Sequence, residues 1–188
     1  MGTTTRKRDA PDGSVDLRSL SLENGSAATR TPEVSLDEMT FGGERYVVSI
    51  EDDAVHLEVS RSASGWFLQL RTVARIEGPC WRCLGPAVLD SSARVNEFQA
   101  HGRAGASFDE DLDSPYVDGE RLDLVTWTID AVTDALPPAI LCQDDCRGLC
   151  TSCGANLNIG VCGCAASKKP VQGLSGIGRL LAESGEAP

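Results

Sequence analysis

The side chains of this 188-residue chain whose types and spacing point most directly to chemistry are its eight cysteines. They fall into four close pairs along the sequence: Cys80 and Cys83, Cys142 and Cys146, Cys150 and Cys153, and Cys162 and Cys164. A short spacer lets both sulfurs of a pair face one ion from a tight turn. The four pairs therefore predict two tetrahedral metal sites with four sulfur ligands each.

The pairs can be joined into two sites in several ways, and spacing alone does not choose among them. We favour one site from Cys80, Cys83, Cys142 and Cys146, and another from Cys150, Cys153, Cys162 and Cys164. The second set is local in sequence, so it closes without long-range help. The first set closes a long loop, which can stabilise a small fold considerably.

Zinc in a structural role is the metal that this ligand set favours, because catalytic zinc keeps one position open for water. Arg82 and Arg147 lie beside the cysteines in sequence and are placed to offset the charge of the thiolates. Two alternatives stay open. A thioredoxin-like redox pair at Cys80 and Cys83 lacks the expected βαβ context, whereas an iron–sulfur cluster also accepts four cysteines.

The expected cellular compartment favours metal binding by the cysteines over disulfide bonds. No apolar stretch follows the polar, basic N-terminus to serve as a signal peptide or a membrane span. We therefore expect a cytoplasmic protein with reduced thiols and no membrane partner. No constellation of nucleophile, base and cofactor is evident, so we expect neither an enzyme nor a small-molecule substrate.

The elements that must position the cysteines begin with strands. From Tyr46 apolar and polar residues alternate, which predicts antiparallel strands over residues 46–50, 55–60 and 66–77 and a weaker one over 87–99. In the long strand one face carries Trp66, Leu68, Leu70, Ala74 and Ile76, and the solvent face carries Gln69, Arg71, Arg75 and Glu77. The sequence thus predicts a sheet with one face open to water.

One main helix follows an acidic, turn-rich loop. Asp123 is placed to cap it, Pro137 and Pro138 to end it. Val125, Ile129, Val132 and Leu136 form its predicted apolar stripe. The expected fold class is α+β: an antiparallel β-sheet with one main helix and a C-terminal cysteine-rich zinc knuckle.

Composition divides the chain into three parts. Residues 1–35 read as a mostly disordered tail, from which Val15, Leu17 and Leu20 could dock on the domain. Residues 36–164 form the expected zinc-binding domain. Residues 165–188 read as a flexible tail that contains a short amphipathic helix around residues 174–181.

Charge is unevenly spread along this acidic chain, whose net charge is -11. Residues 55–105 carry more arginines than acids, and Arg71 and Arg75 on the solvent face are the candidate RNA contacts. Residues 106–140 are strongly acidic, with Arg121 as their single basic residue, and would face a basic protein instead.

Several strings of residues also resemble a known family: Cys80-Trp-Arg-Cys83-Leu, Leu136-Pro137, Cys146-Arg-Gly-Leu-Cys150 and Cys153-Gly-Ala-Asn-Leu-Asn158. They are similar to the YceD family, also called large ribosomal RNA subunit accumulation protein, from about Val15 to Cys164. The resemblance implies a non-catalytic factor needed for normal levels of large-subunit ribosomal RNA. Its expected partner is the precursor of that RNA or a ribosomal protein.

The chain departs from the family in small ways. Members often have Pro where this chain has Thr151, and some lack the last four cysteines, which implies that the second metal site is an accessory. An alternative function is a zinc-stabilised regulator that binds only a protein partner.

Overall fold

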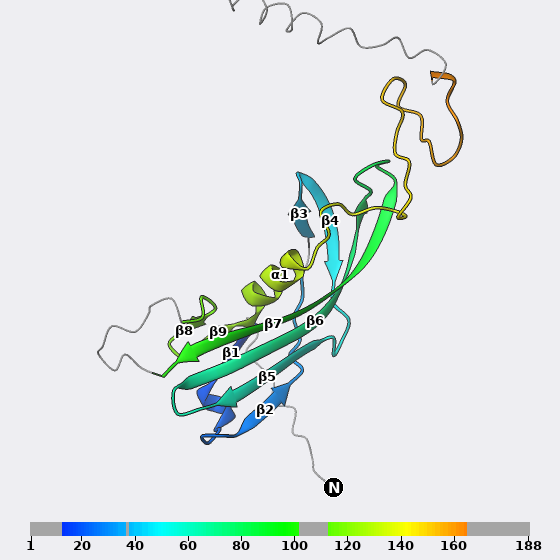
Figure 1. The fold of residues 1–188 in the computed structure, drawn as a ribbon. Helices are drawn as coiled ribbons and strands as arrows, with labels where there is room; N and C mark the ends of the chain where they lie inside the picture. Colours follow the sequence, from blue (N-terminus) through cyan, green and yellow to red (C-terminus); the bar gives the residue numbers. More distant parts are fainter. Residues whose placement is uncertain (1–12, 37, 102–112, 165–188) are drawn as a thin grey trace, which may run out of the picture.

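Two long antiparallel strands, β6 (Gly65–Pro79) and β7 (Pro86–Ala100), form the centre of the fold (Figure 1). The computed structural model describes residues 13–36, 38–101 and 113–164. The remaining elements are, in chain order, β1 (Ser14–Asp16), the 3-10 helix η1 (Arg18–Leu20), β2 (Ala27–Arg30), β3 (Glu38–Phe41), β4 (Glu44–Ser49), β5 (Val55–Arg61), β8 (Val117–Asp118), β9 (Arg121–Asp123) and α1 (Leu124–Asp134).

The main sheet is built around β6, which pairs with β7 along its whole length. On its other edge β6 pairs first with β5 and then with β4, so two shorter strands share one long one. The strands of the main sheet are hydrogen-bonded in the order β2-β5-β6-β4-β3, and β7 pairs with β6 outside this order. Every pairing is antiparallel. A small second sheet has the order β1-β9-β8.

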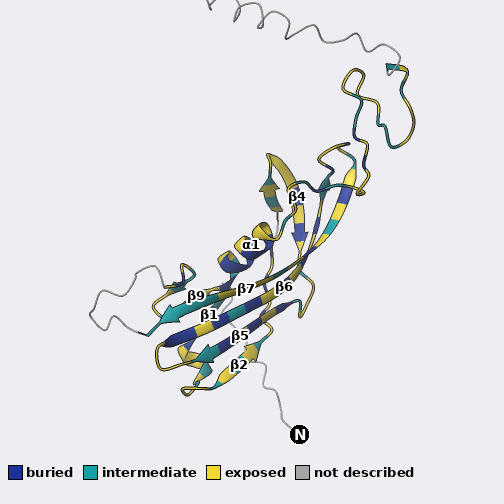
Figure 2. Ribbon diagram, viewed as in Figure 1, coloured by how far each residue is buried: buried dark blue, intermediate teal, exposed yellow. Residues whose placement is uncertain are grey.

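The alternation predicted for the long strand is confirmed. Its buried side chains are Trp66, Leu68, Leu70, Thr72, Ala74 and Ile76, and Figure 2 shows buried and exposed residues in turn along β6. The weaker strand predicted over residues 87–99 is also present as β7. An α+β fold with an antiparallel sheet and one main helix is therefore what the described residues form.

The helix α1 packs against β6, β7 and β1 and begins and ends as predicted. The Asp123 side chain caps it by accepting from the Thr126 backbone N–H at 3.0 Å. Of the predicted stripe, Val132 is fully buried, whereas Val125, Ile129 and Leu136 are partly buried and pack against the core. The buried face is formed by Leu124, Trp127, Thr128, Ala131 and Val132. Residues three and four apart share a helix face, and the large Trp127 ring decides which face turns inward.

The predicted boundary at residue 36 is too late in the chain. Val15 and Leu17 are buried, and β1 pairs with β9 so that Val15 lies opposite Leu122. β2 extends the main sheet by pairing with β5. The predicted docking of this apolar stretch is confirmed, because Val15 and Leu17 are buried and Leu20 is partly buried against the same core. The predicted helix at residues 174–181 lies outside the described residues.

Within the described ranges no helix has the length and apolar character that spanning a lipid bilayer requires.

Candidate metal centres

The first cysteine pair lies in the turn that joins β6 to β7. The Cys80 N–H donates to the Gly85 carbonyl at 2.7 Å, and the Leu84 N–H donates to the Cys80 carbonyl at 2.9 Å. This turn places Cys80 and Cys83 at the tip of the long hairpin.

The second pair reaches the same tip from the far end of the helix. After Pro137 and Pro138 the chain runs to Ile140, whose carbonyl accepts from the Trp81 N–H at 2.8 Å. Cys142 and Cys146 then lie beside the hairpin turn. Figure 1 shows residues 140–164 continuing beyond this end of the sheet.

All four sulfur atoms of the first group, which comprises Cys80, Cys83, Cys142 and Cys146, lie within 4.8 Å of one another. The sulfurs of Cys80 and Cys146 are 3.7 Å apart, and those of Cys83 and Cys142, separated by 59 positions in the sequence, are 3.6 Å apart. Tetrahedral zinc with bonds of about 2.3 Å places its sulfurs about 3.8 Å apart. The spacing of these sulfurs is therefore compatible with one metal ion bound by four thiolates.

Polar groups around the first group hold it in place. The Asn158 amide donates to the Cys146 sulfur at 3.3 Å, and its oxygen accepts from the Arg147 N–H at 2.7 Å. The Arg82 guanidinium donates to the Cys146 carbonyl at 2.9 Å, so this side chain fixes the backbone beside the first group. Such outer contacts orient metal ligands.

The pKa values of the thiols in the first group also favour binding of a cation. Burial opposes ionisation of Cys80, but the backbone N–H groups of Cys83, Cys142 and Arg82 outweigh it and lower the pKa of that thiol to about 6. Burial and the neighbouring sulfurs raise the pKa of Cys142 to about 12. Thiols this close compete for negative charge, and a divalent cation among them removes the competition.

The second group comprises Cys150, Cys153, Cys162 and Cys164, whose sulfurs also lie within 4.8 Å of one another. Backbone N–H groups of Ser152 and Cys153 lower the pKa of Cys150 to about 6, and the hydrogen bond with Cys153 raises that of Cys164 to about 12. None of these four residues is buried, whereas three of the first group are. The second group is thus the more exposed of the two.

The two groups are linked through the hairpin turn. The Leu149 N–H, which lies between the two groups in sequence, donates to the Arg82 carbonyl at 3.2 Å. The preceding residue, Gly148, has a φ of 72° and lies against the same carbonyl. A Cβ at Gly148 would lie 3.0 Å from the Arg82 carbonyl oxygen, so a side chain would crowd this contact. The structure thus brings the eight cysteines together in the grouping that the sequence analysis favoured, where other groupings stayed open.

The turns at Cys80–Cys83 and Cys150–Cys153 share one backbone feature. In the first turn the left-handed residue is Leu84, with φ 57°, directly after Cys83. Gly154, directly after Cys153, takes the same conformation with φ 71°. In both of these turns the residue directly after the second cysteine is therefore the left-handed one.

The candidate RNA contacts Arg71 and Arg75 lie on the solvent face of β6, apart from the cysteines. Arg75 forms ion pairs with Glu77 at 3.0 Å and Asp90 at 3.3 Å, so its charge is already compensated. Arg71 instead contacts the neutral Gln69. Sequence reasoning missed Arg94, because only the strand register places it opposite Arg71.

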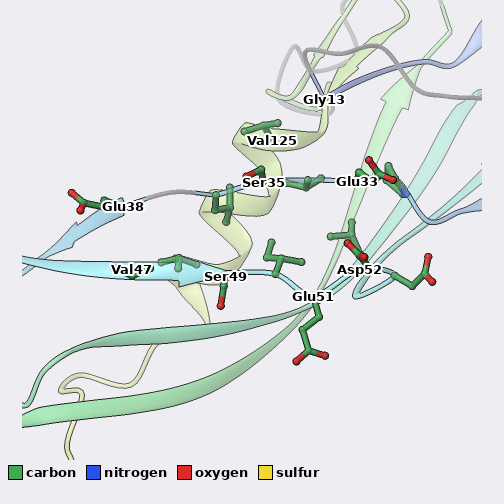
Figure 3. Close-up of a pocket in the computed structure, with 16 residues that line it drawn as sticks. Gly13, Glu33, Ser35, Glu38, Val47, Ser49, Glu51, Asp52 and Val125 are labelled. Atoms are coloured by element: carbon green, nitrogen blue, oxygen red, sulfur yellow. The ribbon is translucent and has the colours of Figure 1, made fainter.

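A cavity of about 900 Å³ lies where residues 32–36 and Glu38 pass the ends of β4 and β5 (Figure 3). Figure 3 shows Glu38 at one end of it and Glu33 and Asp52 at the other. Its described lining combines acidic and apolar residues and includes no histidine, cysteine or basic residue.

Comparisons with known proteins point to one family. The model of YceD, described as large ribosomal RNA subunit accumulation protein, matches residues 68–177. Uncharacterized proteins of Mycobacterium tuberculosis and Mycobacterium bovis are each 33% identical over 161 residues, which covers 83% of this chain and 76% of the relative. One of Mycobacterium leprae is 36% identical over 80 residues, 42% of this chain and 36% of the relative. No solved structure matches. The chain therefore belongs to the YceD family.

Proposed function

We propose that the protein is a non-catalytic, zinc-stabilised accessory factor in biogenesis of the large ribosomal subunit, required for accumulation of its RNA. The family description supports the ribosomal part. The observation that carries the proposal is the pair of four-cysteine groups, each with its sulfurs within 4.8 Å. Sites closed by four cysteines leave no position for a substrate, which favours a structural metal.

Zinc would be held by Cys80, Cys83, Cys142 and Cys146 in one site and by Cys150, Cys153, Cys162 and Cys164 in the other. Bound there, it would supply cross-links and charge compensation. Other residues of the chain shape the two sites. Asn158 and Arg82 orient the first site, and the left-handed residues Leu84 and Gly154 close the two turns. The result is a rigid end to the β6–β7 hairpin.

Depletion of the protein in cells tests this function. We expect the ratio of large-subunit to small-subunit ribosomal RNA to fall, and re-expression of the wild-type chain to restore it. Tagged protein captured from lysate should bring down large-subunit precursors. An unchanged RNA ratio after complete depletion would contradict the proposal.

A regulator that binds only a protein partner is the second candidate. The acidic cavity lined by Glu33, Glu38, Glu51, Asp52 and Asp53 favours it, because a basic ribosomal protein would complement this charge. The capture experiment separates the two. Partners bridged by RNA vanish after ribonuclease treatment, whereas a directly bound ribosomal protein persists.

A further inference from the structure

The open face of the main sheet, on the side away from α1, carries an ordered series of cross-strand pairs. Along β6 and β7 these are Phe67 with Phe98, Gln69 with Asn96, Arg71 with Arg94, and Val73 with Ser92. Phe67 is 45% exposed and Val73 is 51% exposed. Aromatic, amide and guanidinium groups therefore follow one another on one surface, which we call the open-face strip.

The centre of the open-face strip holds two like charges directly opposite each other. Arg71 donates to the Gln69 side-chain oxygen at 3.1 and 2.7 Å, and Arg94 donates to the same oxygen at 3.3 Å. Among the described residues neither arginine has an ion pair with a carboxylate. Like charges facing each other across two strands are unfavourable. An anion between the two guanidiniums relieves this repulsion.

A third polar side chain completes the site from the neighbouring strand. His56 on β5 lies opposite Arg71, and with Arg71 and Arg94 it lines a surface depression of about 300 Å³. The acid that the strand register places nearest to Arg71 is Glu58 on β5. It lies opposite Gln69, which is on the Phe67 side of Arg71. From Arg71 and Arg94 the depression extends away from Glu58, toward Val73 and Ser92. Its lining contains no acidic residue. An anion therefore meets the arginines there.

We propose that the open-face strip binds single-stranded RNA, with Arg71 and Arg94 clamping a backbone phosphate and Phe67 stacking on a base. Guanidinium groups match phosphate oxygens through paired hydrogen bonds. Exposed aromatics on a sheet stack on unpaired bases, and an amide such as Asn96 bonds to base edges. The net charge of -11 repels RNA elsewhere, so binding depends on this local site. This proposal rests on the proposed role in RNA accumulation.

Fluorescence anisotropy of zinc-loaded, full-length protein with a labelled single-stranded RNA of mixed sequence tests the site. Arg71→Ala with Arg94→Ala should weaken binding at least about tenfold and make the slope of log affinity against log salt shallower by about one. Phe67→Ala should weaken it at least about fivefold. The matched control is Arg45→Ala with Arg75→Ala, which removes the same charge from two arginines that face acids, and it should bind like wild type.

Zinc content and melting temperature must stay near wild type in all these variants for the comparison to hold. Equal losses in the two double variants would overturn the site, because they would mean that bulk charge alone governs binding. Absence of any RNA binding by the wild-type protein would overturn it as well.

Complementation of depleted cells separates this inference from the proposed function. Arg71→Ala with Arg94→Ala should fail to restore large-subunit RNA, and the control double variant should restore it. If depletion lowers that RNA and both double variants restore it, the open-face site is wrong while the proposed function stands. If depletion leaves the RNA unchanged, the proposed function itself is wrong.

Discussion

At the scale of single residues, Leu84 and Gly154 show what a cysteine turn demands of the backbone. Both follow the second cysteine of a pair and both are left-handed, but only one of them is a glycine. The left-handed conformation costs a residue with a Cβ about 1–2 kcal/mol. Leu84 is 64% exposed, so its side chain recovers little of that by burial.

Leu84→Gly should therefore stabilise the zinc-loaded protein by about 0.5–1 kcal/mol, since relief of strain exceeds the entropy that glycine adds to the unfolded chain. Thermal melts measure the effect. Leu84→Ala is the control, because it removes the same apolar surface and keeps the Cβ, and it should give no gain. Equal melting temperatures for the glycine and alanine variants would contradict the argument.

At the scale of elements, the first cysteine group joins the β6–β7 hairpin to the segment after α1. Cys80 is fully buried and its sulfur meets Cys146, which lies 66 positions further along the chain. The second group closes within residues 150–164 and is more exposed. Loss of a ligand in the first group therefore releases a long loop, whereas loss in the second loosens only a local knuckle.

Cys80→Ser should consequently destabilise the fold by about 3 kcal/mol, lowering the melting temperature by about 6–12 °C, and Cys162→Ser by much less. Each substitution keeps size and removes one ligand, so the two variants control for each other. Elemental analysis should find about two zinc ions in the wild-type chain and about one in Cys162→Ser. The reverse order of melting temperatures would exclude this division of roles, and iron with visible absorbance would identify a cluster instead.

At the scale of the whole molecule, acidic charge dominates. The net charge is -11, and five carboxylate side chains line the cavity beside β4. Self-repulsion of this kind destabilises a compact state, and salt screens it. RNA binding at the open-face strip has the opposite dependence, because salt competes with the phosphates.

Salt should therefore raise stability while it weakens RNA binding. Between about 0.01 and 0.1 M NaCl, where the Debye length falls from about 30 to 10 Å, we expect the melting temperature to rise by about 2–4 °C. Glu51→Gln with Asp52→Asn should reduce this rise, because both line the acidic cavity. A melting temperature that falls with salt would show that attractive ion pairs outweigh the repulsion.

The sequence by itself determined the parts of this protein that depend on local spacing. Alternation in residues 66–77 predicted which side chains of β6 face the core, Asp123 and the two prolines bounded α1, and the cysteine spacing predicted four close pairs. These features depend on strand and helix periods and on tight turns. None of these features requires a contact between residues that are far apart in the sequence.

Tertiary structure decided what depends on residues far apart in the chain. Register alone placed Arg94 opposite Arg71 and Asp90 opposite Arg75. Docking of α1 on the sheet turned Trp127 inward and left most of the expected stripe only partly buried, and pairing with β9 fixed where Val15 enters the core. Each outcome is set by which surfaces meet, because the free energy of burial and pairing comes from both partners and spacing along one segment describes only one of them.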